Sequence, residues 1–330
     1  MKKLGVVLLS LFLCFGIVGC KKEDGKLQIG ILQYLSHEAL DLAKDGFIEG
    51  LEEAGFIDGE NITITVLNPQ TEASVMQTMV EQLVRESDLI LAIATTAAVA
   101  VMNEANGQGK DVPILFTAVT DPVDAELVET MEAPGGNVTG TSDMNPVADQ
   151  IELVKELLPN ATKVGILYTS SEENSEIQAN IAIEAAEDLD MTTAVRTIST
   201  LNDLTTVVNA LISTDLVDAI YVPTDNLIAS SMGTLEEIVK SNPTKYVPIV
   251  CGETSQVLNG GSITYGLNYF NLGKDTAAMA VRILNGELPR NIPATTVQTV
   301  ELIINKKQLE EDLGITVPTS LLERADQILE

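Results

Sequence analysis

Short apolar segments alternate with amphipathic segments along most of this 330-residue chain, and the alternation limits the folds that it can adopt. At 37–56, apolar side chains recur every three or four residues, as on one face of a helix. The apolar segments predict strands at 27–34, 61–68, 88–96, 112–119, 137–143, 163–170, 191–199, 218–224, 247–253 and 262–269. Continuously apolar strands between helices are typical of parallel sheets that are covered on both faces. The sequence therefore predicts an α/β fold.

The second half of the chain repeats three segments of the first half in the same order. The pairs are QIGIL (28–32) with KVGIL (163–167), VPIL (112–115) with VPIV (247–250), and DLILAIATT (88–96) with DAIYVPTDN (218–226). Buried strands can resemble each other by chance, but three matches in one order favour two similar lobes. We therefore expect two doubly wound parallel-sheet lobes joined by a hinge.

The first 20 residues have the pattern of an export signal. Two lysines precede an apolar run that is shorter than a typical membrane span, and Gly19 precedes Cys20. This pattern predicts a signal peptide at 1–19, lipidation of Cys20, and a short tether at 20–26. An uncut anchor or an ordinary export signal is the alternative. A lipidated Cys20 would attach the protein to a membrane through its acyl chains.

The charge of the chain argues against nucleic acid as a partner. The full chain has a net charge of −29, and removal of Lys2 and Lys3 leaves 17 basic residues against 48 acidic ones, or −31. No basic patch is expected at that balance. After removal of the signal, with Cys20 lipidated, only Cys251 keeps a free thiol, so no internal disulfide is expected.

Residues for catalysis or metal binding are scarce. The chain has one histidine, His37, and no Trp, and the usual nucleophile and phosphate-loop motifs are absent. Asp225 and Glu253 could act as an acid–base pair, but no activated nucleophile accompanies them. We therefore expect no enzyme activity, no metal site and no cofactor.

Ligands of doubly wound sheets bind outside the carboxyl ends of the strands, where this sequence places hydroxyl groups and carboxylates. Thr95 and Thr96 lead directly into a helix, where hydroxyls and free backbone N–H groups could hold an anion. Simple capping of that helix is the alternative. Asp225 and Glu253 end two strands of the second lobe, where each could cap a helix or hold a ligand ammonium group. An anion seat in one lobe and a carboxylate in the other would suit a zwitterionic amino acid.

Other candidates lie at further strand ends. Ser171 and Asn174 follow the strand at 163–170 and could either contact a ligand or form a capped helix start. Tyr34 and Tyr168 could line an apolar pocket, with core packing as the alternative. His37 could contact a ligand at the mouth of the cleft or be an exposed helix-start residue.

Several longer strings resemble one known family. ILFTAVTDPV (114–123), PGGNVTGTSD (134–143), AIYVPTDN (219–226) and YGLNYFNLGK (265–274), together with the lipidation pattern, resemble the substrate-binding lipoproteins of ABC transporters. The closest similarity is to the subfamily for tryptophan, tyrosine or phenylalanine uptake, and it covers nearly all of residues 26–305. The resemblance implies a type I periplasmic-binding fold with three hinge crossings, and an ABC permease and ATPase as partners.

The resemblance also implies roles for strand-end residues. It implies that Thr95, Thr96 and Thr117 hold the α-carboxylate of an amino acid and that Asp225 holds its ammonium group. Further polar contacts would come from Thr141, Ser171, Asn174 and Glu253. The side-chain pocket would be formed by Tyr34, His37 and Tyr168.

These inferences give a complete expectation for the protein. The first lobe should comprise 27–142 and 268–293, and the second 143–267 and 294–330. The protein should be a monomer that is anchored outside the cytoplasm through Cys20. It should bind an aromatic or large apolar amino acid by closure of the two lobes and deliver it to the permease. A sensory receptor of the same fold is the alternative.

Overall fold

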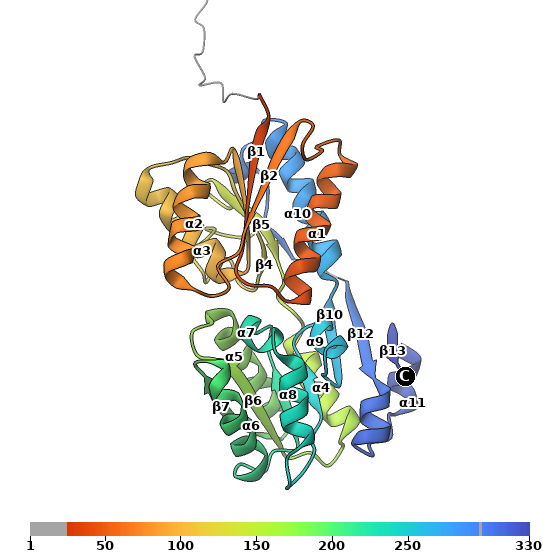
Figure 1. Cartoon of the computed structure of the whole chain (residues 1–330). Coiled ribbons are helices and arrows are strands. Elements are labelled where there is room, and N and C mark those ends of the chain that lie inside the picture. Colours follow the sequence, from red (N-terminus) through yellow and green to blue (C-terminus); the bar gives the residue numbers. More distant parts are fainter. Residues whose placement is uncertain (1–24, 297–298) are drawn as a thin grey trace, which may run out of the picture.

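Two separate sheets organise the chain (Figure 1), as the repeat predicted. The computed structural model describes residues 25–296 and 299–330, so the expected signal peptide, Cys20 and most of the tether lie outside the described residues. The first sheet contains β1 (Leu27–Gln33), β2 (Ile62–Leu67), β3 (Leu89–Ile93), β4 (Ile114–Val119), β5 (Val138–Ser142) and β11 (Thr295–Thr296). The second contains β6 (Lys163–Thr169), β7 (Thr192–Ile198), β8 (Ala219–Val222), β9 (Ile249–Cys251), β10 (Ile263–Leu267), β12 (Val300–Asn305) and β13 (Gln327–Leu329).

The two sheets share one strand order, which confirms the α/β fold of two doubly wound lobes. The first sheet runs β11-β5-β4-β3-β1-β2, and the second runs β13-β12-β10-β9-β8-β6-β7. When the strands of each lobe are numbered from the first in sequence, the core of each sheet therefore has the order 2-1-3-4-5. The strand order reverses beside the first strand of each lobe. All pairs are parallel except β10 with β12.

Helices cover the sheets, as continuously buried strands require. The first lobe has α1 (Glu38–Glu53), α2 (Ala73–Glu86), α3 (Thr95–Gln108), α10 (Tyr269–Leu284) and the turn η2 (Pro289–Asn291). The second has α4 (Val147–Leu157), α5 (Glu173–Asp188), η1 (Leu201–Asp203), α6 (Leu204–Ser213), α7 (Asn226–Ala229), α8 (Met232–Lys240), α9 (Thr254–Leu258), the π-helical turn η3 (Gln308–Asp312) and α11 (Thr319–Arg324). In the described part of the chain, every helix is too short or too polar to span a bilayer.

The chain crosses between the lobes after β5, β10 and β11. Helix α10 thus returns to the first lobe and packs along α1 (Figure 1). Strand β11 also belongs to the first sheet, just beyond the boundary expected at residue 293, because Thr295 and Thr296 pair with Thr141 and Ser142 of β5.

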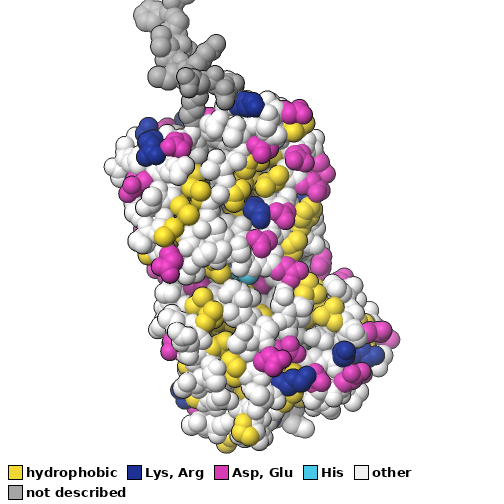
Figure 2. Space-filling model, in the orientation of Figure 1, with side chains coloured by type: hydrophobic (Ala, Val, Ile, Leu, Met, Phe, Trp, Pro, Cys, Tyr) yellow, Lys and Arg dark blue, Asp and Glu magenta, His cyan; other side chains and the backbone are white. Residues whose placement is uncertain are grey.

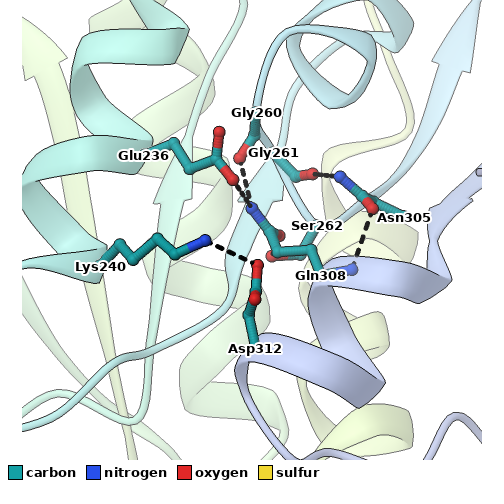
Figure 3. Close-up of polar contacts among 8 residues, drawn as sticks. All are labelled: Glu236, Lys240, Gly260, Gly261, Ser262, Asn305, Gln308 and Asp312. Atoms are coloured by element: carbon teal, nitrogen blue, oxygen red, sulfur yellow. Dashed lines mark hydrogen bonds and ion pairs between the residues drawn. The ribbon is translucent and has the colours of Figure 1, made fainter.

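A hydrogen-bond network ties the last segment of the chain to the second lobe (Figure 3). The side-chain oxygen of Gln308 accepts a hydrogen bond from Ser262 Oγ at 2.6 Å, and its amide nitrogen donates to Glu236 Oε1 at 3.0 Å. Lys240 Nζ pairs with Asp312 Oδ2 at 3.0 Å. Residues after β12 are therefore held against α8 and the start of β10.

The contact between α1 and α10 depends on glycine. A Cβ atom on Gly273 would lie 2.0 Å from the carbonyl oxygen of Ala43, and one on Gly46 would lie 2.0 Å from that of Phe270. Neither distance leaves room for a methyl group, and both obstacles are backbone atoms. The two helices can therefore approach closely only because these positions have no side chain.

Gly273→Ala should lower the free energy of unfolding by about 1–3 kcal/mol, because the added methyl group must push α10 away from α1. Gly107→Ala is the matched control, since nothing lies within 4 Å of its added Cβ near the end of α3. Alanine there should be neutral or stabilise by up to about 1 kcal/mol. Urea denaturation of both variants checks this, and a Gly273→Ala protein as stable as the wild type would contradict it.

Candidate functional site

The carboxyl ends of the central strands bring residues from both lobes to one junction. The strand order reverses between β1 and β3 and between β6 and β8, which is where doubly wound sheets bind ligands. Tyr34 follows β1 and Thr95 begins the helix after β3, whereas Asp225 follows β8. His37 Nε2 and Asn226 Oδ1 lie 3.2 Å apart and join the lobes across this junction.

A small cavity is enclosed at the junction. Its lining includes His37, Ala118, Asp143, Asn174, Asp225, Glu253 and Tyr269. Its volume of about 10 Å³ is close to that of one water molecule. A second hollow of about 140 Å³ lies between α3 and α5, where Thr95, Thr96 and Val99 face Ser171 and Glu173. The lobes are therefore closed on each other, with little free space between them.

The charge around the enclosed cavity is negative. Three of its lining residues, Asp143, Asp225 and Glu253, are acidic and almost fully buried, and none of its lining residues is Lys or Arg. Figure 2 shows the same imbalance on one outer face, where acidic side chains outnumber basic ones. Buried carboxylates without cationic partners are costly, so this site favours a positively charged group.

Asp225 caps a helix inside the second lobe. Its carboxylate accepts hydrogen bonds from Thr169 N at 2.6 Å, Thr169 Oγ1 at 2.8 Å, Ser175 Oγ at 3.0 Å and Ile228 N at 2.9 Å. Ile228 N is the donor that makes Asp225 the N-cap of α7. Burial raises the pKa of Asp225 although these bonds oppose the rise. Its oxygens are thus already occupied in the closed protein.

Glu172 lies beside Asp225 and is also bound by its own lobe. It accepts hydrogen bonds from Asn226 N at 2.9 Å, Asn226 Nδ2 at 2.7 Å and Leu227 N at 2.9 Å. Burial and then the charge of Asp225 raise the pKa of Glu172. This carboxyl group therefore supports the turn before α7.

Glu253 differs from these two carboxylates because one of its oxygens is unused. Its Oε2 accepts from Ser255 N at 3.2 Å, which makes Glu253 the N-cap of α9. Its Oε1 is buried and has no hydrogen-bond partner. Burial raises the pKa of Glu253 to about 7. A donor from a bound molecule would satisfy this oxygen.

Buried polar atoms without partners gather at the junction. Among the described residues, five buried side-chain atoms lack a hydrogen-bond partner, and four belong to residues that line the cavity or the hollow. These four are His37 Nδ1, Thr95 Oγ1, Asn174 Oδ1 and Glu253 Oε1. Two come from each lobe. Since buried polar groups are normally hydrogen-bonded, the closed junction is incomplete without a polar molecule.

Two predicted site residues instead form part of the first lobe's interior. Thr117 and Thr141 are fully buried, and their hydroxyls lie 3.0 Å apart. Thr141 Oγ1 also lies 2.7 Å from Thr276 Oγ1 of α10. Their hydroxyls therefore already have partners under α10, and neither residue is among those that line the cavity or the hollow.

The predicted aromatic residues also separate. Tyr34 is 9% exposed, and burial raises its pKa to about 12, with further contributions from the charges of Glu172 and Asp225. The carboxylates of the second lobe therefore lie near enough to raise the pKa of Tyr34, whose side chain packs in the core of the first lobe. Tyr168 is partly buried and packs against the second lobe's core, outside the residues that line either space.

Sequence reasoning did not select three residues of the junction. Asp143 accepts a hydrogen bond from Tyr269 Oη at 2.6 Å where two hinge crossings lie together, and Gln178 Nε2 donates to Thr120 Oγ1 across the lobes at 3.1 Å. Asp143 and Tyr269 are each the last residue of a predicted strand, and this position is the sequence signal that could have selected them as site residues. Gln178 lies within a helix and carries no such signal.

Comparisons with known proteins agree with this architecture. The sequence pattern of the ABC transporter substrate binding protein family matches residues 28–329. A tyrosine-binding protein from Clostridioides difficile is 40% identical over 293 residues, which cover 88% of this chain and 82% of that protein. An ABC domain from Streptococcus pneumoniae, solved in complex with L-Trp, is 38% identical, with a TM-score of 0.86 and coverage of 92% of this chain and 99% of that one.

A third relative distinguishes the closed from the open arrangement. A substrate-binding protein with adhesive properties from Clostridium difficile, solved ligand-free and open, is also 38% identical but has a TM-score of 0.68, over 91% of this chain and 98% of that one. Because both structures are equally similar in sequence, the difference in TM-score indicates that the lobes here are arranged as in the L-Trp complex. Two doubly wound lobes closed on a polar junction, and a family match over almost the whole chain, lead to one conclusion: this protein belongs to the ABC transporter substrate-binding protein family.

Proposed function

We propose that this protein binds a free amino acid as a zwitterion between its closed lobes. The four unpartnered polar atoms at the junction carry this proposal, because they include acceptors on the second lobe and a hydroxyl on the first. Members of this family are solute-binding proteins that act outside the cytoplasm, and such proteins are not enzymes.

The ammonium group would bind at the acidic cavity. Glu253 Oε1 and Asn174 Oδ1 are free acceptors there, so they are its first partners. Asp225 would add negative charge, although its own hydrogen bonds are already made inside the second lobe. A ligand cation would thus compensate carboxylates that have no Lys or Arg partner in the cavity.

The carboxylate would bind at the start of α3. Thr95 Oγ1 is buried without a partner, and Thr96 lines the hollow beside it. The first N–H groups of a 14-residue helix point to the same place and favour an anion. Ala94, just before this helix, has a φ of 81°, a strained value for a residue with a side chain. Ser171 faces this group from the second lobe.

The ligand's side chain would be aromatic. The relatives that bind L-Trp or tyrosine support this preference, and Tyr34 lies near the second lobe's carboxylates, where a ring could pack. The cavity and the hollow are both smaller than the roughly 300 Å³ at which ligand pockets begin. Side chains would therefore rearrange around the ring as the lobes close.

The transport context follows from the family. The protein would deliver its amino acid to an ABC permease driven by an ATPase. That it acts as a monomer anchored through a lipid on Cys20 is part of our proposal and does not follow from the family. Ligand contacts available only in the closed state would shift the lobes toward closure, and the permease would release the ligand by favouring the open state.

Glu253→Gln should weaken binding of L-Tyr and L-Trp by about 10- to 100-fold, because a charge-assisted hydrogen bond contributes about 1.5–3 kcal/mol. The same substitution should not weaken binding of 3-(4-hydroxyphenyl)propionate, which lacks the ammonium group. Glu187→Gln, at an exposed position near the end of α5, is the control for the change in net charge. Isothermal titration calorimetry measures all three affinities. Equal losses for tyrosine and its deamino analogue would refute the assignment of Glu253.

Asp225→Asn should lower the stability of the ligand-free protein by about 1–3 kcal/mol, because an amide nitrogen cannot accept hydrogen bonds from Thr169 or Ile228. Asp188→Asn, at an exposed position in α5, should change it little. Thermal unfolding without ligand gives the comparison. An unchanged melting temperature with a large loss of amino-acid affinity would instead make Asp225 the main ammonium partner.

A further inference from the structure

Among the described residues, three side-chain hydrogen bonds join the lobes away from the hinge crossings, without any ligand atom. Gln178 Nε2 donates to Thr120 Oγ1 at 3.1 Å, and Asn259 Nδ2 donates to Glu38 Oε2 at 2.5 Å. The third joins His37 Nε2 to Asn226 Oδ1 at 3.2 Å, beside the acidic cavity. These contacts can exist only when the lobes are closed. They therefore contribute to closure independently of the ligand.

The orientation of Asn226 is fixed by its own lobe. Its Nδ2 and its backbone N both donate to Glu172, so its side-chain oxygen must face the first lobe. An amide oxygen can only accept, which means that His37 Nε2 carries the hydrogen. In the neutral ring, His37 Nδ1 is then an unprotonated acceptor.

The other side of the His37 ring has no place for a second proton. His37 Nδ1 is buried and has no hydrogen-bond partner. His37 is the N-cap residue of α1, but its side chain makes no capping bond there. Protonation of Nδ1 would place an N–H group and a positive charge at a buried position that has no acceptor within hydrogen-bond distance. Closure with this geometry therefore requires the neutral ring.

Most charged groups near His37 are negative, although Asp41 is paired with Lys44 at 3.5 Å. Glu38 and Asp41 lie on its own helix, Glu172 lies behind Asn226, and the acidic cavity adds Asp143, Asp225 and Glu253. The hydrogen bond with Asn226 and the charge of Asp41 favour a protonated ring. Burial nevertheless outweighs them and lowers the pKa of His37 to about 4. The closed state thus binds a proton at His37 less readily than an exposed histidine does.

We propose that His37 is a closure-positioning residue whose neutral ring, held by the Glu172–Asn226 pair across the junction, stabilises the closed lobes and so raises ligand affinity. This inference rests on the proposed function, because it concerns the closure that traps the amino acid. It assigns His37 to contact between the lobes rather than to selection among ligands.

The direction of the pH effect follows from the two states. His37 should titrate near its ordinary pKa of about 6.5 when the lobes are open, and near about 4 when they are closed. The closed state is therefore fully favoured above pH 6.5 and progressively disfavoured as the pH falls toward 4. From these two values, the His37 contribution to affinity should fall about tenfold between pH 7.5 and pH 5.5.

A comparison of the His37→Gln variant with the wild type isolates the contribution of His37 protonation to ligand affinity. Glutamine keeps an Nε2 donor for Asn226 but cannot be protonated, and both proteins share every surrounding carboxylate. The ratio of dissociation constants, variant to wild type, should therefore drop about tenfold from pH 7.5 to pH 5.5 for each of L-Trp, L-Tyr and L-Phe. An unchanged ratio would overturn the proposal.

His37→Ala removes the hydrogen bond between the lobes. It should raise the dissociation constants of L-Trp, L-Tyr and L-Phe by one common factor, about two- to tenfold at pH 7.5. A factor that differs among the three ligands would make His37 a pocket residue and would overturn the proposal.

Small-angle X-ray scattering without ligand keeps the test separate from the proposed function. If none of these amino acids binds, the radius of gyration should still increase more in the wild type than in His37→Gln as the pH falls from 7.5 to 5.5. Identical responses would contradict the proposal.

Discussion

Closure of the two lobes forces polar strand ends into a space from which water is largely excluded. Asp143, Asp225 and Glu253 are all nearly fully buried there, and no Lys or Arg lines the cavity with them. Donors of the second lobe satisfy the oxygens of Asp225, and the hydroxyls of Thr120 and Tyr269 in the first lobe satisfy those of Asp143, but Glu253 Oε1 has no donor. The remaining unpartnered acceptors need hydrogen-bond donors, and our proposal assigns that role to the ammonium group of a bound amino acid.

The rest of the fold holds these strand ends in position. Each lobe repeats the order 2-1-3-4-5, so the reversal of strand order occurs at equivalent places in both. Helix α10 returns to pack on α1 through Gly46 and Gly273, while η3 is fastened to the second lobe through Gln308. Each lobe can therefore move as one unit about the crossings after β5, β10 and β11, which is what clamshell closure requires.

The sequence predicted the strands from β1 to β10 and the repeat because buried parallel strands leave a continuous apolar signal, but it did not predict β11, β12 and β13. It was less informative about side chains. Thr117 and Thr141 lie near the carboxyl ends of β4 and β5, but their hydroxyls bond to each other, and that of Thr141 also bonds to Thr276 of α10. Gln178 and Glu172 reach the junction from α5 and the turn before it, where a local pattern cannot separate a cap from a contact.

The sequence by itself determined the α/β class, the two lobes and the collection of hydroxyls and carboxylates at strand ends, because these depend on local apolar periodicity. Only the tertiary structure decided which of these groups are satisfied within a lobe and which are free. Asp225 and Glu253 look alike in sequence, since each follows a buried strand and precedes a helix. Four donors converge on Asp225, whereas Glu253 Oε1 has none. That difference arises from residues distant in the chain, and so packing alone decides it.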